Sequence, residues 1–275
     1  MIKFFRKIRY DLMEKKPTFA EASAGTKTGL SVEVSAKAGK YFKYAIGEIV
    51  LVVIGILIAL SINNWNENRK LKAEENELLT NLSLSFERKL NELESKNIGR
   101  TKNINGIDKL LETIATKNKT ISDDEMFVLM QDLFTWYAVN EEFSIIDMLY
   151  SSGKINMISN DSLKNKLISW PDYMEEMLEE QRVLQDLVVN NLNPLISEYV
   201  SSANLLNSFK QKNAPEIIYN ESPHPNDFNG LFNDRGFESL IAQKNMYLIA
   251  NIEDTKILIV DAKIILQLIS EELNK

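Results

Sequence analysis

One apolar stretch constrains this chain more than any other feature. From Ile49 to Leu60 every residue is apolar or Gly. A hydrocarbon core about 30 Å thick needs roughly 20 mostly apolar helical residues, and aromatic residues gather at its two interfaces. Tyr44 precedes the stretch and Trp65 follows it. The sequence therefore predicts a transmembrane helix over residues 41–65.

A cleaved signal peptide is the alternative interpretation of this stretch. Small residues at Ala59 and Ser61 fit a cleavage site. However, more than forty residues precede the apolar core, which is long for a leader, and Asn63, Asn64 and Trp65 continue the helix into the interface. These features favour a retained span.

The charges are distributed unevenly around the apolar stretch. Residues 1–47 hold ten Lys and Arg against four Asp and Glu, whereas residues 48–275 hold 22 against 35. An excess of Lys and Arg beside a span stays cytoplasmic, so we expect a cytoplasmic N-terminus and an acidic domain outside the cytoplasm. An acidic domain without a basic patch also argues against a nucleic-acid partner.

Length and composition bound the remaining possibilities. A chain of 275 residues suits one span and a domain of about 200 residues that buries its own core. The sequence contains no Cys, which excludes disulfides, thiolate catalysis and Cys-ligated metal sites.

Two segments precede the span. Residues 1–16 place Met1, Phe5, Ile8 and Leu12 on one face with basic residues around the rest, which predicts a basic amphipathic helix. That helix either lies on the anionic inner leaflet or serves only as a topology signal. Residues 17–40 are rich in Ala, Ser, Gly and Thr without apolar periodicity, so we expect a flexible low-complexity linker.

Several stretches resemble a bacterial family of single-pass membrane proteins known only as a domain of unknown function. They are MIKFFRKIR, YAIGEIVLVVIGILIALSINNWNE, YSSGKINMISNDSLKNKL and FESLIAQKNMYLIANIED. The resemblance implies a single-pass topology and a mainly helical domain beyond the span, and it implies no activity. In that family the basic helix runs almost directly into the span, so residues 17–39 depart from its pattern.

Four residues of the span are candidates for membrane or partner contacts. Glu48 lies about one turn inside Tyr44, where a carboxylate can reach the headgroup level, contact a partner or move a proton. Gly55 and Ala59 form a small-xxx-small pair that lets two spans approach closely. Trp65 is expected at the interface.

Residues 66–275 show helical periodicity throughout. Apolar residues three, four or seven apart predict a helix that continues from the span, with a kink at Gly99 or Gly106. An isolated coiled coil is the alternative, but Ser85, Asn97 and Arg100 interrupt its heptads and favour a bundle helix.

Three further helices are expected in this domain. One begins at Ser122 and carries apolar residues as far as Tyr137. The next is capped by Ser159 or Asp161, and the last is capped by Asp234 and runs to about Leu273. Gly153 is expected as a left-handed cap, Pro171 as a kink and residues 201–234 as an irregular loop.

Candidate sites in the domain each have a simpler interpretation. Glu175, Glu176, Glu179 and Glu180 could resemble metal ligands, but no Glu-x-x-His motif accompanies them, so we interpret them as a solvated face. The single His224 lies between two prolines in a loop. Aromatic residues at Trp136 and Tyr137 are expected in the core, with a ligand pocket as the alternative.

These features predict an all-α protein: one N-terminal transmembrane helix followed by an extracytoplasmic up-down-up-down helical bundle. We expect a bacterial inner-membrane protein with its C-terminal domain in the periplasm. It would contact the lipid bilayer and either a protein partner or a second copy. An interaction or scaffolding role ranks first and a ligand-binding sensory domain second. No catalytic residue, cofactor or metal site is predicted.

Overall fold

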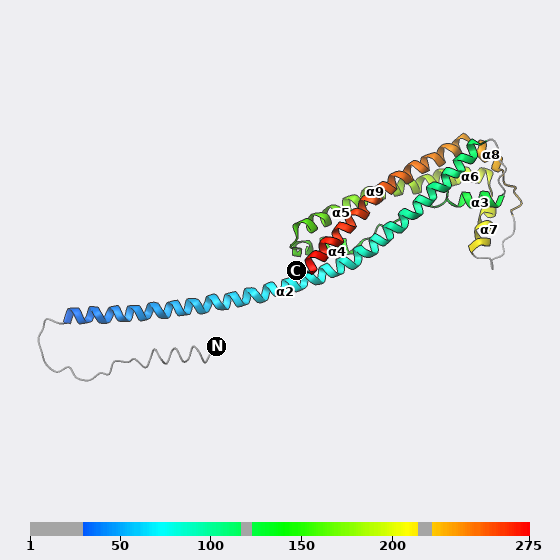
Figure 1. The fold of residues 1–275 in the computed structure, drawn as a ribbon. Helices are drawn as coiled ribbons and strands as arrows, with labels where there is room; N and C mark the ends of the chain where they lie inside the picture. Colours follow the sequence, from blue (N-terminus) through cyan, green and yellow to red (C-terminus); the bar gives the residue numbers. More distant parts are fainter. Residues whose placement is uncertain (1–29, 117–122, 214–221) are drawn as a thin grey trace. The chain divides into compact units, whose positions relative to one another are not determined.

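The structure is a computed structural model that describes the backbone of residues 30–116, 123–213 and 222–275 (Figure 1). Side chains are described for residues 45–116, 125–207 and 222–275. Every regular element in these ranges is helical, and the chain divides into two compact units, Met1–Glu67 and Asn68–Lys275. The second unit begins close to the expected start of the domain at residue 66.

The helix that contains the apolar stretch is α2, Leu30–Ala115, and it belongs to both units. A linker was expected over residues 17–40, but residues 30–40 of that range are helical and belong to α2. Once a helix has nucleated, each further residue adds one hydrogen bond, so a strong apolar helix extends readily into Ala-rich sequence. The expected basic helix and residues 17–29 lie outside the described residues.

Two further long helical segments form the second unit. The first consists of α5 (Asp161–Asp186), the π-helical turn η2 (Leu187–Leu192) and α6 (Asn193–Tyr199). The second is α9, Arg235–Leu273. Their starts are set locally: Asn160, rather than either predicted cap, accepts a hydrogen bond from the backbone of α5, and Asp234 accepts from two amides of α9 as expected.

Short helices connect the long ones. They are α3 (Asp123–Gln131), α4 (Ser144–Ser151), η1 (Lys154–Met157), α7 (Ser202–Asn213) and α8 (Phe228–Asn233). Gly153 has the expected left-handed conformation, with φ 69°. Two expectations need correction: the helix expected as far as Tyr137 ends at Gln131, and the loop expected over residues 201–234 contains α7 and α8.

The second unit packs around two apolar clusters, which follow one another along α2, α5 to α6, and α9. One joins α2, α4, α5 and the C-terminal half of α9, and includes Phe86, Leu149, Trp170 and Ile265. The other joins α2, α3, η2, α6, α8 and the N-terminal half of α9, and includes Ile107, Met130, Leu192 and Phe237.

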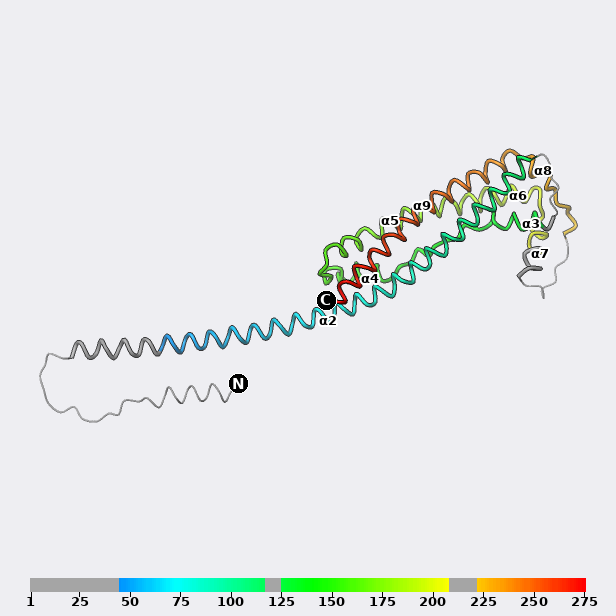
Figure 2. The backbone as a smooth tube through the Cα atoms, in the orientation of Figure 1, coloured from blue at the N-terminus to red at the C-terminus, as the bar shows by residue number. Residues whose placement is uncertain are grey.

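The directions of the long helices follow from contacts between their ends. Asn160 donates to Glu272 over 2.7 Å, so the start of α5 lies beside the end of α9. On α2, Glu94 pairs with Lys263 at 2.7 Å and Asp108 accepts from Asn245 at 2.6 Å. Within the second unit, α9 therefore runs antiparallel to both α2 and α5 (Figure 2).

Candidate functional site

All four candidate contact residues of the span lie on α2. Glu48, Gly55 and Ala59 are exposed and, being seven and four residues apart, share one helix face. A Cβ added at Gly55 would meet nothing within 4 Å, and Trp65 is 64% exposed. This placement leaves the helix face accessible to lipid or a partner. The contacts of these four residues with lipid or a partner stay predictions.

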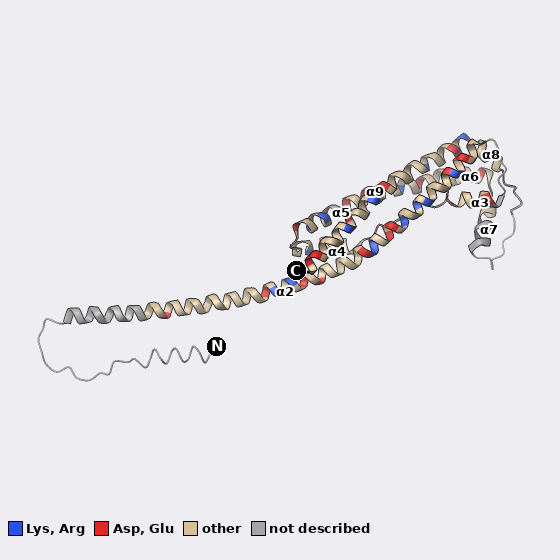
Figure 3. Ribbon diagram, in the orientation of Figure 1, with Lys and Arg blue, Asp and Glu red and all other residues tan. Residues whose placement is uncertain are grey.

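Among the described residues, one helix is long and apolar enough to cross a membrane. It is the described part of α2, and none of its most apolar 18-residue window is buried. Figure 3 shows a long run of this helix without Lys, Arg, Asp or Glu, and in the sequence residues 49–66 contain none of them. An apolar surface of this length, exposed on every side of a helix, is the property that a hydrocarbon environment matches.

A layer of polar side chains lies where the two apolar clusters of the second unit meet. Arg100 of α2 is fully buried and donates to Thr255 Oγ1 at 2.6 Å and to Gln181 Oε1 at 3.3 Å. Asn251 of α9 donates to the carbonyl of Met177 on α5 at 2.8 Å. The layer thus links all three long helices by hydrogen bonds and fixes their mutual register.

The guanidinium of Arg100 is held by uncharged acceptors. Burial lowers the pKa of Arg100 to about 10, because desolvation disfavours the charged form. Its Nε atom has no acceptor among the described residues, and the buried Oδ1 atom of Asn251 has no donor among them. A buried charge with this incomplete set of partners destabilises the folded state relative to an apolar side chain of similar shape.

A non-helical segment, residues 132–140, takes the place of the expected second long helix, and we call it the strap. Its backbone groups bond to buried side chains of the long helices. Lys244 donates to the carbonyls of Asp132 and Leu133 at 2.6 and 2.8 Å. Gln181 accepts from Val139 N at 2.7 Å and donates to Val139 O at 3.2 Å. These bonds replace those that a helix would make internally.

Asn103 and Lys244 hold the beginning of the strap. Asn103 donates to Asp132 O at 2.6 Å and to Thr135 Oγ1 at 2.7 Å. Lys244 is fully buried, and desolvation lowers its pKa to about 7 although the carboxylate of Asp132 acts in the opposite direction. The ammonium therefore carries a desolvation penalty near neutral pH.

Two glycines of α2 let the strap approach the helix. A Cβ at Gly99 would overlap the ring of Tyr137, and a Cβ at Gly106 would overlap the carboxylate of Asp132. A kink or break was expected at these positions; α2 does not break there, because it continues to Ala115, and the kink stays a prediction. The glycines serve close packing.

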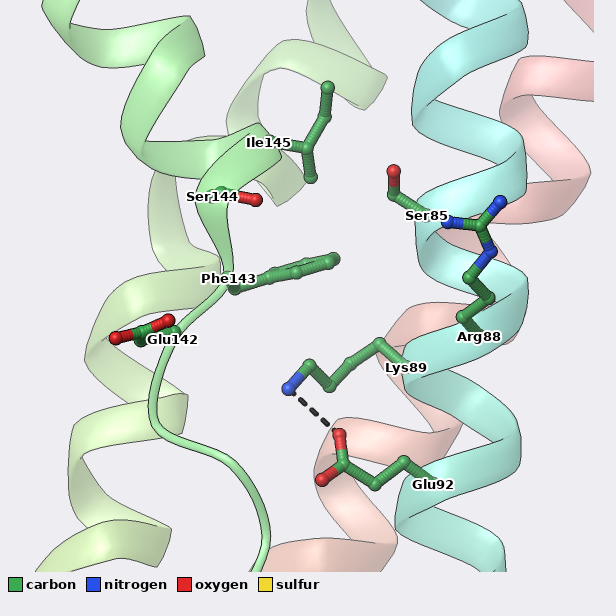
Figure 4. Close-up of a pocket in the computed structure, with 8 residues that line it drawn as sticks. All are labelled: Ser85, Arg88, Lys89, Glu92, Glu142, Phe143, Ser144 and Ile145. Atoms are coloured by element: carbon green, nitrogen blue, oxygen red, sulfur yellow. Dashed lines mark hydrogen bonds and ion pairs between the residues drawn. The ribbon is translucent and has the colours of Figure 1, made fainter.

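The end of the strap borders a small polar pocket of about 200 Å³ (Figure 4). Lys89 pairs with Glu92 at 2.9 Å, donates to Asn140 O at 3.0 Å and lies 5.2 Å from the ring centre of Phe143. Asn140 N in turn donates to Glu92 at 2.8 Å. The charged groups of this pocket thus hold the strap against α2.

Three of the four glutamates on α5, Glu175, Glu176 and Glu179, are exposed, whereas Glu180 is half-buried. Glu175 binds Arg182 through two bonds of 2.8 and 3.0 Å, and this pairing lowers its pKa. The pKa of Glu180 is raised by burial and by the nearby Asp254 and Glu179. Within the described ranges, no group of three or more His, Asp or Glu side chains is placed to hold a metal ion.

The outer face of α9 carries four exposed apolar side chains, Met246, Ile249, Ile257 and Val260. Their exposed fractions are 69, 51, 48 and 56%. Apolar periodicity in the sequence did not predict this exposed face. The spacing of three, eight and three residues places all four on one side of the helix, over roughly 21 Å along its axis.

The sequence also did not reveal the polar layer or the strap, although one signal was present. Arg100 lies seven residues from both Leu93 and Ile107, which are fully buried, so it occupies a core position of α2. Trp136 and Tyr137 belong to the strap, and Trp136 packs against the second apolar cluster. This contact favours the core interpretation of Trp136.

In the described residues every regular element is helical, and one helix is long and apolar enough to cross a membrane. In comparison with known families, a model described as a family of unknown function (DUF6090) matches residues 48–175. The match begins in α2 at Glu48, one residue before the apolar stretch, includes the strap and α4, and ends inside α5. It fits an uncharacterised domain. No curated protein and no solved structure matches the chain.

Proposed function

We propose that this protein is a membrane-anchored interaction or scaffolding protein of the bacterial cell envelope. In this proposal α2 crosses the cytoplasmic membrane once, with residues 1–47 inside because of their basic charge. Residues 68–275 form a helical bundle outside, in which α3, the strap and α4 make the fourth side beside the three long helices. The partner is a protein or a second copy of the chain.

The outer face of α9 is the observation that carries this proposal. Isolated exposed apolar residues are ordinary on a protein surface, but a row of them along one helix marks an interaction surface. Glu253 and Lys256 lie within the row and pair with each other at 2.6 Å, so the face offers one neutralised ion pair among apolar groups. A partner helix with an apolar face would cover such a row.

The chemistry of the buried polar groups also supports a structural role. The two cations with the largest pKa shifts, Arg100 and Lys244, bond to side chains and carbonyls of neighbouring segments. Their hydrogen bonds set how these neighbouring segments are aligned within the second unit. A domain with a row of exposed apolar side chains along α9 suits partner binding.

Photocrosslinking in native membranes tests the proposal. A photoreactive residue is introduced into the full-length chain at Ile249 or Ile257, and at the exposed Glu179 of α5 as the matched control. We expect the same discrete adduct from both α9 positions and its absence at Glu179. The mass of the adduct distinguishes a second copy from a different protein. Equal crosslinking at all three positions, or none at any, contradicts the proposal.

A sensory domain that binds a small ligand and signals through a separate partner is the second candidate. It is favoured by a pocket of about 580 Å³ between α4 and α5. Pockets for small molecules commonly measure about 300–1,000 Å³.

A further inference from the structure

The pocket between α4 and α5 has an apolar floor. Ile146, Trp170, Met174 and Leu178 line it, and each is at most 5% exposed. Trp170 packs edge-on against Phe86 with ring centres 4.8 Å apart, which fixes the indole in place. Its Nε1 atom is buried and has no acceptor among the described residues. The floor is therefore closely packed and apolar.

The wall of this pocket is stabilised around Pro171. Proline lacks a backbone N–H, so a carbonyl of the preceding turn of α5 loses its helical donor. Tyr150 of α4 supplies a hydroxyl there, at 3.3 Å from Leu167 O and 2.9 Å from Ile168 O. The pocket thus persists as a defined shape, because α4 is tied to α5 at the proline.

The rim of the pocket is acidic. Its lining residues include Glu141, Asp147, Asp172 and Glu175, and they include no Lys or Arg. Arg182 binds Glu175 at 2.8 Å and lies 3.9 Å from Glu141, so those two carboxylates are partly neutralised. Asp147 and Asp172 are exposed on α4 and α5, and burial together with the charge of Asp172 raises the pKa of Tyr150.

We propose that this pocket binds a small molecule that carries a protonated amine on an apolar or aromatic body. The apolar body contacts Trp170 and Met174, and the amine lies at the rim formed by Asp147 and Asp172. Charge complementarity with the acidic rim selects a cation. The inference is independent of the interaction surface on α9, because the two sites share no residue.

The test uses phenethylamine as the probe, because it is small, water-soluble and protonated at neutral pH. Binding to the full-length chain in nanodiscs is measured by saturation-transfer NMR. We expect saturable binding of phenethylamine, weaker binding of the neutral 2-phenylethanol and none of phenylacetate. Binding of phenethylamine weakens as salt is added, because its contacts with the rim are screened. Equal binding of all three probes, or no binding of the amine, overturns the inference.

Charge-removing variants locate the site. The double variant D147N/D172N removes two exposed carboxylates of the rim, and we expect it to weaken phenethylamine binding about tenfold. The matched control D161N/E198Q removes two exposed carboxylates, one from α5 and one from α6, that do not line the pocket, and leaves the affinity unchanged. Thermal unfolding of both variants verifies that each folds like the parent. An equal loss of affinity in both, or in neither, places the amine elsewhere and overturns the assignment.

Discussion

At the scale of single residues, Gly99 of α2 makes room for an aromatic ring. Tyr137 has φ 49°, a left-handed conformation that few non-glycine residues adopt, and its ring occupies the space beside Gly99. The strain at Tyr137 and the absence of a Cβ at Gly99 belong to one packing arrangement. The left-handed backbone at Tyr137 accompanies the placement of its ring beside α2, and the missing Cβ of Gly99 leaves room for that ring.

The variant Gly99→Ala tests this packing. Alanine favours helices by about 1 kcal/mol over glycine, but here its Cβ overlaps the Tyr137 ring, so we expect a net loss of about 1–3 kcal/mol in the free energy of unfolding. Gly55→Ala is the control, because its Cβ meets nothing. Urea denaturation of the full-length chain measures both. A Gly99→Ala protein as stable as the parent would contradict the packing argument.

The buried ammonium of Lys244 makes stability depend on pH. Its pKa is about 7 in the folded chain and 10.5 for an ordinary lysine, so between these values the unfolded state binds more protons. The penalty is present in full below pH 7 and is relieved as the pH rises. We expect the free energy of unfolding to rise from pH 7 to pH 9 by up to about 1.4 kcal/mol per pH unit.

The variant Lys244→Met isolates this contribution, because methionine keeps an unbranched apolar stem and cannot titrate. Urea midpoints of the parent and of Lys244→Met are compared at pH 7, 8 and 9. The parent should gain more stability over this range than the variant. Parallel pH profiles would show that Lys244 titrates as an exposed lysine does.

At the scale of elements, the helices with local signals were predictable and the strap was not. The start of α9 follows from Asp234 alone, because the amides that donate to this cap, those of Gly236 and Phe237, lie only two and three residues further along the chain. The strap is held by residues far along the chain: Lys244 lies 112 positions from Asp132, and Gln181 lies 42 from Val139. Apolar periodicity in residues 123–137 predicted a helix, because periodicity does not report which backbone groups are bonded by distant side chains.

Two substitutions in the polar layer should have opposite effects. In Arg100→Met, Thr255 still donates to Asn251 O and Gln181 still bonds to Val139, so we expect unchanged or higher stability. In Gln181→Leu, both polar groups of Val139 lose their partner, and we expect a loss of about 1–3 kcal/mol. Chemical denaturation at neutral pH compares the two. A destabilised Arg100→Met with an unaffected Gln181→Leu would reverse the assigned roles.

At the scale of the whole molecule, two apolar surfaces call for different surroundings. The apolar stretch of α2 is exposed on all sides, as suits lipid, whereas the outer face of α9 is a single row, as suits a partner helix. The apolar residues of both surfaces are visible in the sequence. The apolar stretch was predictable because its composition is extreme. The face on α9 was not, because Ile257 and Val260 look equally suited to a core.

The proposed function requires that α2 crosses a membrane with the second unit outside the cytoplasm, and single-cysteine labelling tests this topology most directly. The natural chain has no Cys, so Ser151→Cys and Ser23→Cys each introduce a unique thiol. Spheroplasts are treated with a membrane-impermeant maleimide before and after permeabilisation. We predict that Ser151→Cys, exposed in the second unit, reacts in intact spheroplasts and that Ser23→Cys reacts only after permeabilisation. Labelling of both sites before permeabilisation, or of Ser23→Cys alone, would contradict the topology on which the proposed function depends.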